Sequence, residues 1–128
     1  MNDEPHPSAS KLVAEARGRT QNLSPEEVAA EVADGAILVD LRESEERVLD
    51  GTIADAIHAP RGMLEFYADP ASTYHRAELD PAKRTILHCT SGGRSALAAE
   101  TLKQLGYTDV AHLGGGINAW KESGHPVE

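Results

Sequence analysis

Short apolar runs alternate along the chain with segments that carry helix signals. Four runs have the length and composition of buried strands: residues 36–40, 56–58, 84–89 and 109–116. Helix signals occur in four further segments: residues 24–34, 63–68, 94–107 and 117–127. Because a parallel strand needs a connection that returns the chain, usually a helix, this alternation predicts an α/β fold with a largely parallel sheet.

The clearest helix start lies at Ser24. Pro25 follows at the first helical position, and Glu27 completes a capping box in which each of the two outer side chains accepts a hydrogen bond from the backbone N–H of the other residue. Gly35 is predicted to end this helix, and the strand at residues 36–40 begins directly afterwards.

The first 20 residues are expected to form an N-terminal extension to one domain at residues 21–128. Residues 1–10 are polar and contain prolines, which predicts a loosely ordered start. Residues 10–19 predict a short helix capped by Ser10.

Composition and charge narrow the classes of function. The chain has 128 residues, of which 40% are hydrophobic, enough for one domain with a sizeable core. With 12 basic against 21 acidic residues, a formal net charge of −9, the chain is not expected to bind nucleic acid or an anionic membrane surface. One cysteine rules out a disulfide framework and suits a reducing compartment. Because no export signal or membrane-length apolar run occurs in the sequence, we expect a cytoplasmic protein.

The single cysteine, Cys89, lies in the sequence HCTSGGRS at the carboxyl end of the strand predicted at residues 84–89. Ligands of parallel α/β sheets bind at this end of the strands. Gly92 and Gly93 allow the loop to curl so that backbone N–H groups point inward, and the following helix adds the positive end of its dipole. A thiol in such a setting ionises more readily than free cysteine, whose pKa is about 8.5. Arg94 adds a planar fork of donors for an oxyanion.

Two interpretations of Cys89 compete. It is either a small buried side chain at a strand end, as free cysteines commonly are, or a nucleophile. We favour the nucleophile, because a purely structural turn requires neither a serine followed by two glycines nor an arginine. His88 points to the opposite face of the strand and is not expected to act as an adjacent base. The other histidines are scattered, and no pair has the spacing of a metal site.

Four segments occur in the order of the signatures of one known family. They are LVDLRESEE at residues 38–46, GTIADAIHAP at 51–60, CTSGGRS at 89–95 and GGGINAWKESGHPV at 114–127. Over residues 22–127 the sequence resembles the rhodanese-like sulfurtransferases. It departs from the second signature, where the family usually has histidine, proline and glycine, at three positions: Thr52, Ala54 and Asp55.

The resemblance implies a three-layer α/β/α domain with a mainly parallel five-stranded sheet. It also implies a catalytic Cys89 that carries sulfur as a persulfide. The donor and the persulfide would be held by the loop, namely Thr90, Ser91, Gly92, Gly93, Arg94 and Ser95. Within this set Arg94 would bind the negative charge of the donor.

Three further positions follow from the resemblance. The family often has a second basic residue where this chain has Thr90, and Arg61 is either a substitute for it or a solvated arginine. Asp40 and Arg42 are expected to tie loops together by hydrogen bonds and so support the site. Trp120 is expected in the core.

The predicted activity is that of a single-domain thiosulfate sulfurtransferase. Sulfane sulfur would pass from thiosulfate or a similar small anion, through Cys89, to cyanide or a thiol, with thiol proteins among the acceptors. No metal or organic cofactor is expected.

Two alternatives remain open. Some phosphatases and arsenate reductases share the rhodanese-like architecture, but their loop is Cys-x5-Arg, whereas Cys89 to Arg94 is Cys-x4-Arg. The shorter loop has fewer backbone donors to wrap a tetrahedral phosphate. The second alternative is a non-catalytic sulfur-relay or binding module. A Cys-His-Asp hydrolase finds no motif support.

Overall fold

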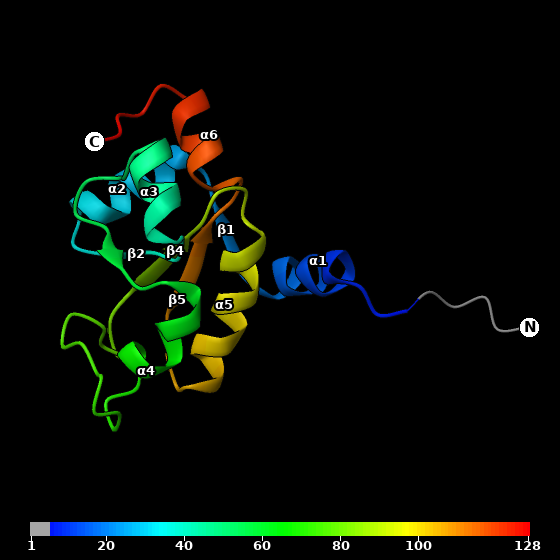
Figure 1. Cartoon of the computed structure of the whole chain (residues 1–128), viewed down its shortest axis with the longest axis vertical. Helices are drawn as coiled ribbons and strands as arrows, with labels where there is room; N and C mark the ends of the chain where they lie inside the picture. The colour runs from blue at the N-terminus through cyan, green and yellow to red at the C-terminus, as the bar shows by residue number, and fades with distance from the viewer. Residues whose placement is uncertain (1–5) are drawn as a thin grey trace, which may run out of the picture.

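The computed structural model describes residues 6–128, which form a five-stranded parallel sheet between two layers of helices (Figure 1). The strand order is β1-β5-β4-β2-β3, and every neighbouring pair is parallel. The strands are β1 (Gln21–Leu23), β2 (Ile37–Asp40), β3 (Ile57–His58), β4 (Thr85–His88) and β5 (Val110–Leu113). The predicted α/β class and parallel sheet are therefore confirmed.

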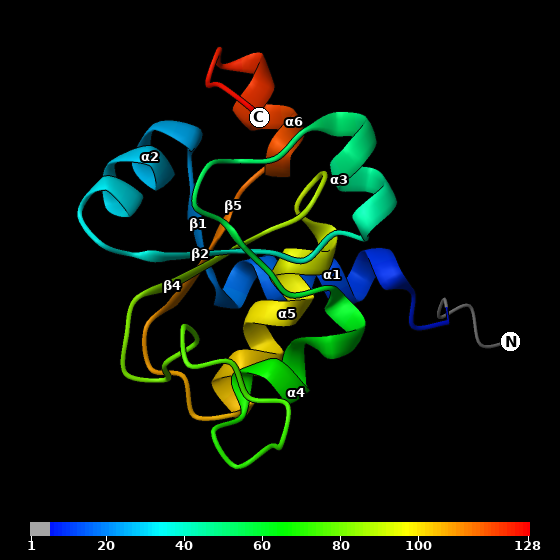
Figure 2. The ribbon, with the colours of Figure 1, turned by 60° about the vertical axis from the view of Figure 1, so that its left-hand side comes forward.

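The helices lie on both faces of this sheet. They are α1 (Ala9–Arg19), α2 (Pro25–Ala33), α3 (Ser44–Asp50), α4 (Leu64–Ala68), α5 (Gly93–Gln104) and α6 (Gly116–Glu122), with a 3-10 turn η1 at Arg61–Met63. The capping box predicted at Ser24 forms in full, with Pro25 at the helix start. Figure 2 shows α2 and α6 on one side of the strands and α4 and α5 on the other.

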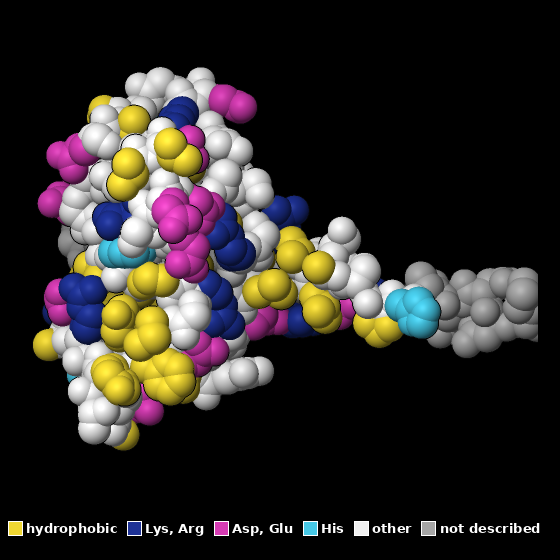
Figure 3. All heavy atoms as spheres, in the orientation of Figure 1, with side chains coloured by type: hydrophobic (Ala, Val, Ile, Leu, Met, Phe, Trp, Pro, Cys, Tyr) yellow, Lys and Arg dark blue, Asp and Glu magenta, His cyan; other side chains and the backbone are white. Residues whose placement is uncertain are grey.

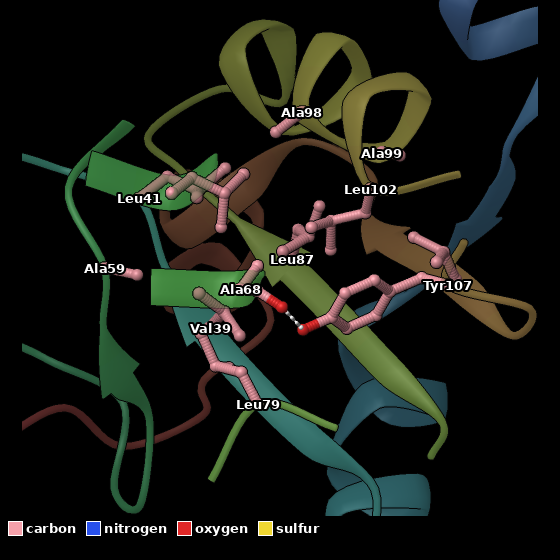
Figure 4. Close-up of a cluster of buried hydrophobic side chains, with 12 residues drawn as sticks. Val39, Leu41, Ala59, Ala68, Leu79, Leu87, Ala98, Ala99, Leu102 and Tyr107 are labelled. Atoms are coloured by element: carbon pink, nitrogen blue, oxygen red, sulfur yellow. Dashed lines mark hydrogen bonds between the residues drawn. The ribbon is translucent and has the colours of Figure 1, made fainter. Parts of the chain in front are cut away.

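Two buried clusters fill the space between the sheet and its helices. Side chains alternate along each strand, so Leu38 and Ile86 face α2 and α6, whereas Val39 and Leu87 face α4 and α5. Figure 4 shows the cluster between the sheet and helices α4 and α5, in which the Tyr107 hydroxyl donates to the Ala68 carbonyl at 2.9 Å. The predicted core position of Trp120 agrees with its place in the cluster under α6.

The same alternation continues one residue past the end of β4 and determines which side chains of β4 and β5 face the same side of the sheet as Cys89. In β4 it turns His88 toward the α6 face and the following Cys89 toward α5. In β5 it turns His112 toward α5 as well, since Ala111 and Leu113 face α6. Cys89 and His112 thus share one face of the sheet.

The helix in the N-terminal extension begins at a different residue from the one predicted. Helix α1 begins at Ala9 because the Ser8 side chain, not Ser10, caps it by accepting from the Lys11 N–H at 3.1 Å. Ser8 is the residue in extended conformation, which an N-cap requires, whereas Ser10 lies inside the helix. Helix α1 packs against α5. The loosely ordered start was predicted partly for residues 1–5, which lie outside the described residues.

Strand β1 was not predicted. Two of its three residues are exposed, so the sequence there contains no apolar run. Its hydrogen bonds to β5 alone make it a strand.

Within residues 6–128, no helix has the length and apolar composition needed to cross a membrane.

Candidate active site

Cys89 directly follows β4, and its side chain lies at the N-terminal end of α5. Its side chain is 1% exposed, and the Gly92 N–H donates to Sγ at 3.2 Å. Gly92 has φ +98° and is the N-cap of α5, so a residue with a side chain would be strained there. The sulfur is therefore held against a backbone donor at the positive end of a 12-residue helix.

The first residues of α6 hold the loop that follows Cys89 by backbone hydrogen bonds. The Ile117 N–H donates to the Cys89 carbonyl at 2.9 Å, and the Asn118 N–H donates to the Thr90 carbonyl at 3.1 Å. This contact requires glycine at Gly116, where a Cβ atom would lie 2.3 Å from the Thr90 carbonyl oxygen. Gly116, the first residue of α6, thus allows the close contact that supports the Cys89 loop, a role that was not predicted from the sequence.

Charged side chains occupy the outer face of the loop. Arg94 donates to both carboxylate oxygens of Glu46, at 2.8 and 2.7 Å, and to the Thr90 hydroxyl at 3.1 Å. Hydrogen bonds from Arg94 lower the pKa of Glu46 to about 2, against the opposing effect of its burial. The side chains of Arg94 and Glu46 are 38% and 31% exposed. Figure 3 shows acidic and basic side chains side by side on the face that carries α3 and the start of α5.

The cation predicted to bind the donor is therefore already paired with an acid. Glu46 belongs to the acidic part of the first signature, 48 positions before Arg94. Arg61, the other basic candidate, donates to Glu65 at 2.9 Å and to the Thr101 hydroxyl at 3.2 Å. Thr101 lies near the C-terminal end of α5, whereas the Cys89 loop lies at its N-terminal end. Exposed Ser91 accepts a bond at its carbonyl oxygen from Arg17 of α1, at 3.4 Å.

Neutral side chains occupy the inner face of the loop. The Cys89 thiol lies 3.6 Å from the Ser95 hydroxyl, which lies 2.8 Å from Nδ1 of His112. Nε2 of His112 lies 2.6 Å from the side-chain oxygen of Asn22 in β1. Ser95 and His112 are fully buried. Burial, with a smaller contribution from the charge of Arg17, lowers the pKa of His112 to about 4.

His112 and Asn22 were not predicted as site residues. Ser95, His112 and Asn22 are far apart in the chain and follow no motif spacing, so His112 was one of several scattered histidines. The available signal was the alternation along the strand of residues 109–116, which puts His112 on one face of the sheet with Cys89.

Asp40 and Arg42 form a buried ion pair at the neighbouring strand end. Both are fully buried, and Arg42 donates to the two carboxylate oxygens of Asp40 at 3.1 and 2.9 Å and to the Gly51 carbonyl at 2.8 Å. Burial opposes ionisation of Asp40, but hydrogen bonds from Arg42, with a smaller electrostatic contribution from the nearby His88, lower its pKa overall. The pair ties the end of β2 to the loop at Gly51. Among residues 6–128 no group of three metal-ligating side chains comes together.

Comparisons with known proteins cover nearly the whole described chain. The family model of the rhodanese-like domain matches residues 24–123. The solved structure of a Rhodopseudomonas palustris protein of unknown function, described as a possible tyrosine phosphatase, superposes with a TM-score of 0.89 and 34% identity over 100% of this chain and 99% of that one.

The curated relatives carry several different names. An uncharacterized Synechocystis protein is 38% identical over 96 residues, 73% of this chain and 48% of that protein. A tRNA uridine(34) hydroxylase of Mesorhizobium japonicum is 38% identical over 89 residues, 69% of this chain and 28% of the hydroxylase. The thiosulfate sulfurtransferase GlpE of Pseudomonas entomophila is 29% identical over 103 residues, 80% of this chain and 86% of that enzyme. The chain thus spans about half the length of the Synechocystis relative and less of the hydroxylase.

Proposed function

Because this chain belongs to the rhodanese-like domain family, we propose that it is a sulfurtransferase that moves sulfane sulfur from thiosulfate, or a similar small anion, to a thiol or cyanide through a persulfide on Cys89. The observation that carries the proposal is the position of the thiol. Sγ lies at the start of α5, with the Gly92 N–H directed at it.

Two displacements complete the cycle. The Cys89 thiolate attacks the outer sulfur of the donor, the sulfur–sulfur bond of the donor breaks, and sulfite leaves with the electron pair. The acceptor then attacks the outer sulfur of the persulfide, and Cys89 leaves as a thiolate. The Gly92 N–H and the start of α5 stabilise the negative charge on sulfur in both steps.

Arg94 has capacity for a donor anion in addition to Glu46. A guanidinium group has five N–H donors, and the bonds from Arg94 to Glu46 and Thr90 use three of them. The donor would thus share Arg94 with Glu46. Because the ion pair is partly exposed, water weakens it and an incoming anion competes with the carboxylate.

A phosphatase is the second candidate, and the likeness to the Rhodopseudomonas palustris structure favours it. Against it stands the Cys-x4-Arg spacing of Cys89 and Arg94, which is one residue shorter than the phosphatase loop. A sulfur-relay role in a partner complex would use the same persulfide.

The test is intact-protein mass spectrometry after incubation with thiosulfate and then with cyanide, with Cys89→Ser as the control. We expect a gain of one sulfur atom, about 32 Da, that cyanide removes and that the variant lacks. If the folded, reduced protein gains no sulfur, thiosulfate is not its donor. Hydrolysis of an aryl phosphate that is lost in Cys89→Ser would replace the proposal with a phosphatase.

A further inference from the structure

The hydrogen-bond chain behind Cys89 has a defined direction, which Asn22 sets. The side-chain nitrogen of Asn22 donates to the carbonyl oxygens of Arg17 and Thr20, at 3.0 and 2.9 Å. Its side-chain oxygen must therefore be the atom that faces His112, and it accepts the hydrogen of Nε2 at 2.6 Å. A neutral His112 then has an unprotonated Nδ1.

The direction continues to the thiol. The unprotonated Nδ1 of His112 accepts the hydroxyl hydrogen of Ser95 at 2.8 Å. With its hydrogen turned toward His112, the Ser95 oxygen presents a lone pair to Cys89, whose thiol donates to it at 3.6 Å. Every donor in the chain points away from Cys89.

We propose that Ser95 and His112 take up the thiol proton of Cys89 when the thiolate forms. The proposal rests on the role of Cys89 as the nucleophile. The Sγ–H bond breaks, with its electron pair left on sulfur, and the proton goes to the Ser95 oxygen. The hydroxyl proton of Ser95 passes at the same time to Nδ1 of His112. His112 acts through Ser95 and is a positioning residue that also holds the proton.

Both end states satisfy every hydrogen bond without movement of a heavy atom. Before the transfer, Cys89 donates to Ser95 and Ser95 donates to His112. Afterwards the His112 Nδ1–H donates to Ser95, and Ser95 donates to the thiolate. If the thiolate formed beside a neutral His112, the single hydroxyl hydrogen of Ser95 could bond to only one of two acceptors, the thiolate or Nδ1. The other acceptor would lose that hydrogen bond, which is costly for a buried group. Cys89 is 1% exposed, so direct proton transfer to water is hindered and the chain supplies a route.

The surroundings of His112 oppose a charged imidazole until Cys89 ionises. Burial and the charge of Arg17 lower the pKa of His112 to about 4, so the imidazole is neutral while Cys89 is a thiol. Arg17 belongs to α1, while Asn22 of β1 and Ser95 of α5 are neutral. Once Cys89 loses its proton, the thiolate becomes the negative charge on the chain and stabilises the imidazolium. When the acceptor releases Cys89 as a thiolate, the same proton can return to it, so the ionisation of Cys89 itself needs no external base.

The test measures the rate at which iodoacetamide alkylates Cys89 as a function of pH, by intact mass. The variants are His112→Gln, which accepts the Ser95 hydrogen but cannot hold a proton, and Ser95→Ala, which interrupts the chain. His75→Gln is the matched control, because the His75 ring is hydrogen-bonded to the Tyr67 carbonyl, away from the Cys89 loop. Thermal unfolding establishes that each variant is folded. No sulfur donor takes part, so this test is independent of the persulfide experiment.

We expect both variants to react at least about tenfold more slowly than wild type near neutral pH, at the low end of what a positioned base contributes. The midpoint of the pH profile should move upward, and His75→Gln should match wild type. Loosened packing alone would expose the buried thiol and speed alkylation, so a slower reaction cannot arise that way. In either folded variant, a midpoint of the pH profile that does not move upward would overturn the proposal, whatever the rate.

Discussion

The outer and inner faces of the Cys89 loop use hydrogen bonds in opposite ways. Outside, Arg94 and Glu46 form a charged pair whose side chains are about a third exposed, and we propose that the donor anion binds there. Inside, Ser95 and His112 are neutral and fully buried. The charged pair thus lies where water screens it, and the groups kept from water are uncharged.

The largest effect is expected from a substitution at Gly116, because the contact of α6 with the Cys89 loop supports both of its faces. In Gly116→Ala the new Cβ would lie 2.3 Å from the Thr90 carbonyl oxygen, so the loop must move. Because displacement of a reacting group by about 1 Å costs about 100-fold, we expect sulfur transfer to fall by at least about 100-fold. Gly62→Ala is the control, since a Cβ at Gly62 meets nothing within 4 Å. Equal activity of the two variants would show that the α6 contact does not hold the loop.

Changes on the outer face should alter donor binding in opposite directions. Arg94→Ala removes the cation, and we expect the KM for thiosulfate to rise and kcat/KM to fall about tenfold, the value of one hydrogen bond to a charged group. Glu46→Gln frees Arg94 from its acid and should lower KM by about twofold to fivefold. Steady-state kinetics with thiosulfate and cyanide measure both. A KM that rises in both variants would mean that the pair acts as one structural unit.

The smallest effect is a pH dependence of stability. The pKa of Glu46 is lowered from 4.5 to about 2 in the folded protein, so its contribution is fully present above pH 4.5 and is lost as the pH falls toward 2. Because the pair is partly exposed, this contribution should be below about 1 kcal/mol. Urea unfolding of wild type and Glu46→Gln should differ near neutral pH and converge in acid. Glu45→Gln, exposed on the same helix, should show no such convergence.

The parts of the fold and site that were predicted from the sequence are those that short segments encode. Buried β4 is a continuous apolar run, and the loop after it carries Cys89, two glycines and Arg94 in one stretch. The parts that were missed depend on contacts between distant residues. Strand β1 exists only through its pairing with β5, and the partners of Ser95 and Arg94 come from other elements, at His112 and Glu46.

The N-terminal segment also shows where a local pattern gives two answers. Ser8 and Ser10 both suit a helix start by residue type. The backbone conformation of Ser8 decides between them, and a serine in the sequence does not reveal that conformation.

The short strand β1 has a consequence for anyone who shortens this chain. The family match begins at residue 24, just past Leu23, so a recombinant fragment cut at that boundary would retain all four signature segments. It would nevertheless lose the strand that covers β5 and leave the backbone N–H and C=O groups of β5 unpaired along an open sheet edge. Such an edge is a template for association with another chain. We therefore expect a fragment that lacks Gln21–Leu23 to associate more readily than a chain that retains them, and the useful cloning boundary lies before α1.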